Sequence, residues 1–427
     1  MTRSGIRRSV DFWFLATLCA ATILGFSTAA IAAMRHSRPM RRGVEAPPPV
    51  SLSQVHVFGA LPAPFALDAR SALMIDAKTG TPLYAFNDHE KMQPASLAKI
   101  MTFYLALQAL HEKRITLDTQ ATVSEAAWRL SLNDTVSRMF LQVGQKVPVR
   151  DLLYGLMVSS GNDAAITLAE YLGGSSEGFT RQMNDEANVL GLTETHFANP
   201  DGLPAEGEYT TAADMVKLGK ALLDRFPDAL NYTSTKEYTF QATAAEGRIK
   251  PITQRNFNTL LFYDGRVNGI KTGHVDEAGF HLVASAQSNG MLLISAVMGT
   301  TSMEKRRVET KKLLDWAFRT FNTVHPEWHK AVPASMRVYQ GAADQVAIAP
   351  ASESYATVER GKERQVTVSY IGNAKYLIAP IRKGDAVGQM VVMQADKQIA
   401  TIPVVAQSSV ARGGLFKRLG DKIRLKL

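Results

Sequence analysis

At 427 residues the chain is long enough for two or more domains, each with a core of its own. Its 46% apolar and 20% charged residues are typical of a folded globular protein. The formal net charge of +9 is confined to the ends: residues 1–42 carry +6 and residues 408–427 carry +5, which leaves −2 for the middle. This distribution argues against nucleic acid as a partner and favours a membrane surface.

The N-terminus is typical of an export signal. Three arginines precede an apolar stretch at 12–26, and small residues follow it, so we expect residues 1–33 to be a signal peptide. The apolar run is also long enough to span a bilayer, which leaves an uncleaved anchor as the alternative. Cys19, the only cysteine, lies inside this segment. The mature chain would therefore have no disulfide, catalytic thiol or cysteine-ligated metal.

The first predicted elements lead towards a buried helix. Residues 34–64 are rich in Arg and Pro at their start and predict a linker. The segments 71–76 and 82–86 flank a turn that contains Gly80, which predicts a β-hairpin. The run 96–110 is apolar almost throughout, so we expect a central helix that is buried on all sides.

Helices and then strands follow this central helix. Further helices are expected at 151–158, 164–172, 211–223 and 304–321, and strands at 269–273, 279–288 and 291–299. The order of these elements predicts an α+β fold in which the hairpin and a three-stranded meander share one antiparallel sheet, with helices covering it. We assign this α+β domain to residues 65–325.

Two further units are expected after this domain. Residues 334–407 contain short alternating strands separated by turns, which predict a small all-β domain. Residues 408–427 place apolar side chains at helical spacing among lysines and arginines. Such a basic amphipathic helix is suited to lie in an anionic membrane surface, and a helix docked on the protein's own body is the alternative.

The central helix carries a candidate nucleophile with its own base. Ser96 and Lys99 are three residues apart, so on a helix they share a face. A serine hydroxyl needs an adjacent base to attack a carbonyl, and a buried lysine can lose its proton near neutral pH and serve as that base. The pair alone is weak evidence, because Ser302 and Lys305 have the same spacing.

Two later motifs separate the alternatives. Ser160-Gly161-Asn162 and Lys271-Thr272-Gly273 follow Ser96 and Lys99 in order, although each also occurs a second time. Ser131-Leu132-Asn133 is expected in a polar loop, where capping accounts for it. Lys78-Thr79-Gly80 is explained by the hairpin turn. Only the set that begins with Ser96 and Lys99 therefore has its three motifs on a buried helix, in a loop between helices and on a strand.

This set resembles the motifs of the serine penicillin-recognising enzymes. The chain is similar to the low-molecular-mass penicillin-binding proteins of the D-alanyl-D-alanine carboxypeptidase type in the stretches 94–102, 159–164, 190–203 and 269–274. The resemblance covers roughly residues 65–325. It implies a β-lactamase/transpeptidase-like catalytic domain that acts on peptidoglycan stem peptides and binds β-lactam antibiotics. It also implies a location at the periplasmic face of the inner membrane, anchored through the C-terminal helix.

The resemblance also implies roles for individual residues. Ser96 would form the acyl-enzyme, Lys99 would take its proton, and Ser160 would relay a proton to the departing D-alanine. The implied substrate-binding residues are Asn162, Lys271, Thr272, Gly273, His274 and Arg306. Asn162 would bind a substrate amide, while Thr272 and an arginine would hold the terminal carboxylate. Arg306 fits that role, with its neighbour Arg307 as the alternative. The backbone N–H groups of Ser96 and His274 would form the oxyanion hole.

Three other functions are compatible with the same motifs. A D,D-endopeptidase would cut peptidoglycan cross-links with the same residues, and a β-lactamase would need a glutamate that activates water, for which there is no convincing candidate. A non-catalytic cell-wall scaffold is the third alternative, although intact motifs argue against it. The sequence predicts neither a metal nor a cofactor, since Pro326 interrupts the one histidine spacing, His325 to His329, that loosely resembles a metal site.

Overall fold

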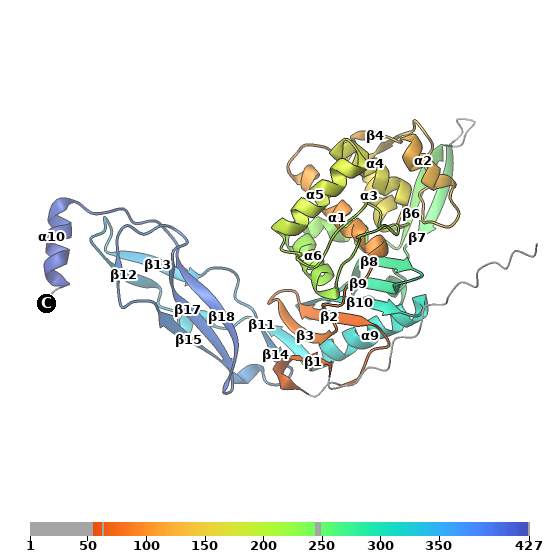
Figure 1. Cartoon of the computed structure of the whole chain (residues 1–427). Helices are drawn as coiled ribbons and strands as arrows, with labels where there is room; N and C mark the ends of the chain where they lie inside the picture. The colour runs from red at the N-terminus through yellow and green to blue at the C-terminus, as the bar shows by residue number, and fades with distance from the viewer. Residues whose placement is uncertain (1–53, 62–63, 244–248, 426–427) are drawn as a thin grey trace, which may run out of the picture. The chain divides into compact units, whose positions relative to one another are not determined.

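The computed structural model describes residues 54–61, 64–243 and 249–425 (Figure 1). The predicted signal peptide at 1–33 lies outside these ranges. Across the described ranges, no helix has the length and apolar character needed to cross a bilayer.

A six-stranded antiparallel sheet forms the centre of the catalytic domain, in the order β1-β3-β2-β10-β9-β8. Its strands are β1 (His56–Val57), β2 (Ser71–Asp76), β3 (Thr81–Phe86), β8 (Val267–Val275), β9 (Gly279–Ser288) and β10 (Met291–Thr300). Ile75 of β2 pairs with Ile294 of β10, so the N-terminal hairpin and the meander share one sheet, as predicted. Strand β1 falls inside the range expected to be a linker.

Helices cover both faces of this sheet, and Figure 1 shows α9 apart from the larger helical layer. The longer helices are α1 (Lys99–His111), α2 (Glu125–Leu132), α3 (Val149–Met157), α4 (Asn162–Gly173), α5 (Ser176–Val189), α6 (Ala212–Arg225) and α9 (Met303–Thr320), and the short ones are α7 (Leu230–Thr233) and α8 (Leu260–Tyr263). Successive side chains of β10 point to opposite faces of the sheet, as they do along any strand. Ile294 packs in the core shared with α1 and α6, whereas Leu293 packs with Leu313 and Leu314 of α9.

The segment that carries Ser96 differs in detail from the predicted helix. Ser96 lies in a 3₁₀ turn, Ala95–Ala98, and the α-helix begins only at Lys99. Ala95 has a φ of +51°, which an L-residue rarely adopts, so the chain enters this turn under local strain. Helix α1 is buried over most of its length, as its uniformly apolar sequence predicts.

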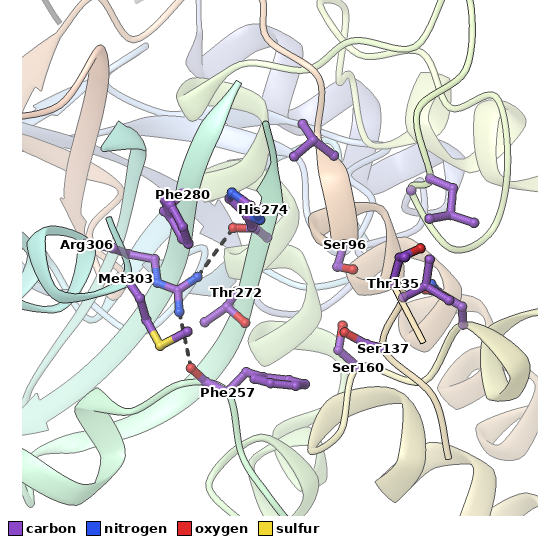
Figure 2. Close-up of a pocket in the computed structure, with 16 residues that line it drawn as sticks. Ser96, Thr135, Ser137, Ser160, Phe257, Thr272, His274, Phe280, Met303 and Arg306 are labelled. Carbon is purple, nitrogen blue, oxygen red and sulfur yellow. Dashed lines mark hydrogen bonds between the residues drawn. The ribbon is translucent and has the colours of Figure 1, made fainter. Parts of the chain in front are cut away.

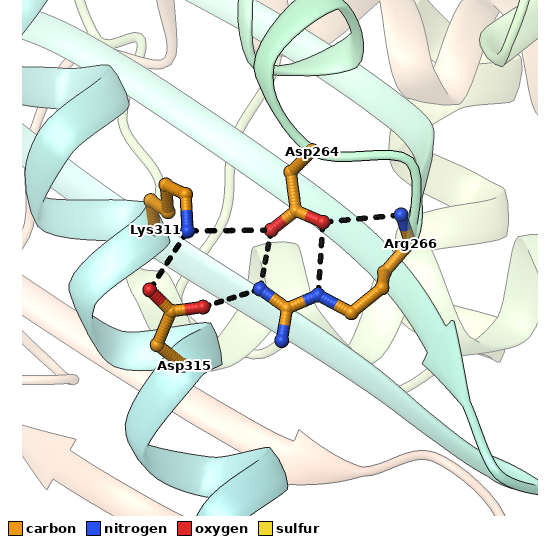
Figure 3. Close-up of polar contacts among 4 residues, drawn as sticks. All are labelled: Asp264, Arg266, Lys311 and Asp315. Carbon is orange, nitrogen blue, oxygen red and sulfur yellow. Dashed lines mark hydrogen bonds and ion pairs between the residues drawn. The ribbon is translucent and has the colours of Figure 1, made fainter.

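Four charged residues tie α9 to the start of β8 (Figure 3). Arg266 forms hydrogen bonds with both carboxylate oxygens of Asp264 and reaches Asp315 on α9, while Lys311 lies 2.8 Å from Asp315. The Asp264 side chain is only 5% exposed. Although burial opposes ionisation, the hydrogen bonds from Arg266 outweigh it and hold the pKa of Asp264 below its ordinary value.

A second sheet builds the C-terminal domain, in the order β15-β17-β18-β13-β12-β16. Its strands are β12 (Ser335–Tyr339), β13 (Gln345–Pro350), β15 (Val366–Gly372), β16 (Leu377–Ile378), β17 (Ala386–Gln394) and β18 (Lys397–Ala406). A separate core that includes Val338, Ile348 and Met390 fills it. The strands β11 (Phe321–Val324) and β14 (Ala356–Glu359) pair beside it, and helix α10 (Leu415–Arg424) follows. The predicted α+β fold class, with a small all-β domain, is confirmed.

Candidate active site

The three motifs meet at one cavity of about 230 Å³. Seven of the nine predicted site residues line it: Ser96, Ser160, Asn162, Thr272, Gly273, His274 and Arg306. The other two, Lys99 and Lys271, are fully buried, and each contacts one of the two lining serines. Ser96, Asn162 and Thr272 come from the helical layer and from the sheet, so the cavity lies where these two layers meet.

Lys99 is placed to act as a base towards Ser96. Its Nζ lies 2.9 Å from Ser96 Oγ and donates hydrogen bonds to Asn162 Oδ1 and the carbonyl oxygen of Asp201. A neutral amine has two N–H groups, so these two acceptors use both and leave the lone pair for the serine hydroxyl. Burial lowers the pKa of Lys99 to about 8, although the nearby acidic side chains Asp201, Asp163 and Glu208 raise it in part.

Lys271 lies next to the second serine, Ser160. Its Nζ donates to Ser160 Oγ at 2.8 Å. Burial lowers the pKa of Lys271 well below its ordinary value, and the charges of Lys99 and Arg306 lower it further. Ser160 has a φ of +55°, so its backbone holds a conformation that is uncommon for a residue with a side chain. Such strain is often found at functional sites.

Arg306 supplies the positive charge of the cavity wall. Figure 2 shows its guanidinium group and the Ser96 hydroxyl on opposite sides of the cavity, with Thr272 between them. The guanidinium group donates to the carbonyl oxygens of Gly273 and Phe257, each at 3.3 Å. Burial lowers the pKa of Arg306 to about 10, which still leaves it charged at neutral pH.

The neighbouring arginine is placed differently. Arg307 forms an ion pair with Glu304 at 3.5 Å and lies over the ring of Tyr263. It is not among the residues that line the cavity. Of the two arginines considered from the sequence, only Arg306 therefore faces the space in which the serines lie.

His274 forms part of the cavity rim. Its ring stacks on Phe280 with 3.8 Å between ring centroids, and its Nε2 lies 3.7 Å from Asp276 Oδ1. The side chain is 39% exposed. This placement holds the end of β8 against β9, so the backbone of residues 273–275 borders the cavity in a fixed position.

Asp163 supports the site although the sequence motifs did not single it out, and the loop expected around Ser131 is wrong. Ser131 does not lie in a polar loop but in the last turn of α2, where it is buried and donates to Asp163 at 2.6 Å. The Asp163 carboxylate also accepts the backbone N–H groups of Met139 and Leu141. It thereby anchors the loop whose residues 135–137 line the cavity. In the sequence, only the position of Asp163 directly after Asn162 could have drawn attention to this residue.

A second supporting segment lies beneath Lys99. Asp201 offers its backbone carbonyl to the Lys99 amine, and Gly202, with a φ of +74°, packs against the Ala95 carbonyl. Both residues belong to the stretch that the family resemblance covers, but nothing in their spacing assigned a role. The contacts join positions about a hundred residues apart, which no local pattern in the sequence reveals.

Comparison with known proteins decides the family. The model of the D-alanyl-D-alanine carboxypeptidase family matches residues 59–302, more than half of the chain. The chain belongs to this family. The model of the penicillin-binding protein 5 C-terminal domain matches residues 321–412, which include the second sheet.

Relatives and solved structures agree with this assignment. The enzyme is 37% identical to D-alanyl-D-alanine carboxypeptidase DacA and 39% identical to DacC, both of Escherichia coli K12, over 84% of this chain and 88% of each relative. The crystal structure of penicillin-binding protein 5 from Haemophilus influenzae matches with a TM-score of 0.74 at 36% identity, covering 82% of this chain and 99% of the other. The sequence-based prediction of a serine-type D-alanyl-D-alanine carboxypeptidase with a penicillin-binding-protein fold is confirmed.

Proposed function

We propose that this carboxypeptidase removes the terminal D-alanine from peptidoglycan pentapeptides through an acyl-enzyme on Ser96. The observation that carries the proposal is that two serines, each contacting its own buried lysine, face one cavity that also contains a buried arginine. A nucleophile with a base, a second hydroxyl and a cation suit a peptide substrate that ends in a carboxylate.

Acylation begins at Ser96. The Ser96 oxygen attacks the carbonyl carbon of the penultimate residue, and its proton passes to the lone pair of Lys99, which lies 2.9 Å away. The negative charge that develops on the carbonyl oxygen is stabilised by the backbone N–H groups of Ser96 and His274. Removal of one such donor typically costs on the order of 10²–10³ in rate.

The leaving D-alanine requires a proton on its amine. Ser160 donates that proton from Oγ and regains one from the Lys99 ammonium group, which took it from Ser96, while Lys271, at 2.8 Å from the same oxygen, holds the hydroxyl in place. The scissile C–N bond breaks, and the acyl group stays on Ser96 as an ester. Water then attacks the ester and gives a proton to neutral Lys99, which passes it to the departing Ser96 oxygen, and the shortened peptide leaves with a new carboxyl group. β-Lactams enter the same first step, and the opened ring stays attached to the serine.

The substrate is held at both ends of the scissile bond. Asn162 offers its amide group to a substrate amide while its Oδ1 accepts from Lys99. Thr272 and Arg306 lie together on the wall opposite Ser96 and bind the terminal carboxylate (Figure 2). A guanidinium group suits a carboxylate because both are planar and can form two parallel hydrogen bonds.

The activity is tested by measuring D-alanine release from a pentapeptide beside cleavage of a dimeric muropeptide. The proposal predicts release of D-alanine by the wild type, none by Ser96→Ala, and little cleavage of the dimer. Preferential cleavage of the dimer would instead identify an endopeptidase. Rapid turnover of penicillin without D-alanine release would identify a β-lactamase.

We also propose that the enzyme is exported and lies at the periplasmic face of the inner membrane, anchored by α10. Leu415, Phe416, Leu419 and Ile423 are each more than half exposed on this helix. Its contact with the protein is instead polar: the buried carboxylate of Asp421 accepts the Gln340 backbone N–H at 2.7 Å. A helix docked for stability would bury its apolar side chains, so this arrangement supports a membrane surface as their partner.

Membrane attachment is tested by flotation of the full chain with vesicles that contain anionic lipid. Phe416→Asp should weaken flotation, because it places a charge on the apolar face. Val189→Asp is the matched control, since Val189 is also exposed and apolar but lies on α5. Equal flotation of both variants would contradict the anchoring role of α10. Sequencing the N-terminus of the exported protein shows whether the signal is cleaved.

A further inference from the structure

A buried histidine on β9 lies behind the cavity and lacks a role in the steps above. His281 is fully buried, and its two ring nitrogens have different partners. The backbone N–H of Gly299 donates to Nδ1 at 2.9 Å, and Nε2 lies 3.2 Å from the carbonyl oxygen of Gln93. The residue therefore bridges β10 and the segment that leads into Ser96.

The partners determine which nitrogen carries the proton. Nδ1 accepts from Gly299, so it is the unprotonated nitrogen, and a neutral imidazole then carries its hydrogen on Nε2. That hydrogen points at the Gln93 carbonyl. Burial lowers the pKa of His281 to about 3, with the hydrogen bond to the Gln93 carbonyl opposing this shift and the charges of Arg306, His274 and Arg70 adding to it, so the ring is neutral at working pH.

An irregularity in the sheet makes the Gly299 N–H available. The pairing of β10 with β9 shifts register between Val297 and Thr300, directly opposite His281. Gly299 has a φ of +75°, which agrees with a local departure from extended strand. The imidazole accepts a hydrogen bond from the Gly299 N–H, which in regular pairing would donate to the neighbouring strand. This contact fixes the orientation of the ring.

The other partner lies three residues before the nucleophile. Between Gln93 and Ser96 the chain passes through Ala95, whose positive φ is maintained only by its surroundings. Gly273 of β8 pairs directly with His281, and there the segment comes so close that a Cβ at Gly273 would lie 3.0 Å from the Pro94 carbonyl oxygen. The turn therefore packs on this face of the sheet, against Gly273 of β8 and the neighbouring His281 ring of β9.

His281 also contacts the opposite wall of the cavity. Its backbone carbonyl accepts from Arg306 at 3.4 Å, beside the bond from Arg306 to the Gly273 carbonyl. One residue thus contacts the segment that positions Ser96 through its side chain and the cavity arginine through its main chain. Loss of the side-chain contact would release the Ser96 segment and leave the arginine contact in place.

We propose that His281 is a positioning residue that fixes the turn carrying Ser96 relative to β8. The proposal rests on the proposed function, because it assumes that Ser96 is the nucleophile. Its reason is geometric: acyl transfer needs the Ser96 oxygen, its backbone N–H and the N–H of His274 around the same carbonyl group. A displacement of about 1 Å in such an arrangement can cost about 100-fold in rate.

Two substitutions separate the two hydrogen bonds. In His281→Gln the side-chain amide N–H can occupy the place of Nε2 and donate to Gln93, while the Gly299 contact is lost. In His281→Asn the side-chain oxygen can occupy the place of Nδ1 and accept from Gly299, while the Gln93 contact is lost. Both exchange the ring for an amide, so differences in packing largely cancel.

The test measures acylation by a penicillin in the full chain, separating the acylation rate constant from the dissociation constant of the initial complex, together with the melting temperature. We expect His281→Asn to lower the acylation rate constant about 10- to 100-fold with little change in the dissociation constant. His281→Gln should retain most of the rate at a similar melting temperature.

Three results would overturn the proposal. These are an unchanged acylation rate in His281→Asn, equal losses in both variants, and losses that follow the melting temperature alone. In each of these cases, normal acylation by the wild type would still support the proposed function. A wild type that does not acylate would overturn both.

Discussion

Lys99 Nζ lies 2.9 Å from Ser96 Oγ, while its hydrogen bonds to Asn162 and Asp201 both end on uncharged oxygens. No carboxylate oxygen of the described residues accepts a hydrogen bond from this ammonium group, and burial lowers its pKa to about 8. The site therefore brings the pKa of Lys99 close to the working pH, where the neutral amine that a general base requires is accessible.

The first prediction concerns the pH dependence of acylation. Below its pKa, Lys99 is protonated and cannot take the Ser96 proton, so the acylation rate constant should rise as the pH increases through about 8. Lys99→Arg should lose about 10²–10⁴-fold at every pH, because a guanidinium group stays charged. Stopped-flow acylation by a chromogenic penicillin measures both. A rate that falls with rising pH across this range would contradict the role of Lys99.

The second prediction changes the charge beside the same amine. Asn162→Asp places a carboxylate where Oδ1 now accepts from Lys99, so it should raise the pKa of Lys99 by about 1–3 units. Acylation would then be slow at pH 8 and recover partly at pH 10. Asn162→Ala is the control, since it removes the acceptor without adding charge and should not shift the profile towards alkaline pH. Identical profiles for the two variants would refute the explanation.

The third prediction compares two glycines with similar backbone conformations. Gly202 and Gly207 have φ values of +74° and +79°, but a Cβ at Gly202 would lie 1.8 Å from the Ala95 carbonyl oxygen, whereas a Cβ at Gly207 meets nothing within 4 Å. Gly207→Ala should cost about 1–2 kcal/mol of unfolding free energy from its backbone alone. Gly202→Ala should cost more and displace the residue next to Ser96.

Urea denaturation and penicillin acylation test this comparison. Gly207→Ala should acylate at close to the wild-type rate, while Gly202→Ala should lose at least about 10-fold, because a small misplacement of the nucleophile is costly. Equal behaviour of the two variants would show that the close contact with Ala95 is unimportant.

The fourth prediction concerns the ion pairs in Figure 3. Arg266→Ala leaves the buried Asp264 carboxylate without its main partner and should lower the free energy of unfolding by about 3 kcal/mol. Lys311→Ala removes a more exposed cation and should cost less than about 1 kcal/mol. Neither change should alter the acylation rate constant, since none of these residues lines the cavity.

The effect of Arg266 should also depend on pH. In the folded chain the pKa of Asp264 is below its ordinary value, so the pairing stabilises the fold above the unfolded pKa of about 3.9. That contribution is lost as the pH falls through the folded pKa. The stability difference between wild type and Arg266→Ala should therefore shrink in strong acid. A difference that grows there would contradict this assignment.

The sequence predicted the parts of the site that follow from motifs and their order. Ser96, Ser160 and Lys271 could be assigned because they lie at fixed spacings on elements whose patterns are strong. The shared sheet could also be predicted, since a hairpin and a meander of apolar strands have few other ways to bury both faces.

The supporting residues could not be predicted in the same way. Asp163 anchors a loop more than twenty residues away, and His281 meets Gln93 across nearly two hundred residues. Such contacts depend on how the layers pack, which local periodicity does not encode. Ser131 illustrates the limit: its sequence is compatible with a loop cap, yet the structure buries it beneath Asp163.

The most direct test of the account is the site of the covalent adduct. Full-length enzyme is treated with benzylpenicillin, and the adduct is counted by intact mass and located by peptide mapping. We predict one adduct per chain, on Ser96, and none in Ser96→Ala. An adduct that persists in Ser96→Ala, one that maps to Ser160 or another residue, or no acylation of the wild type would contradict the account.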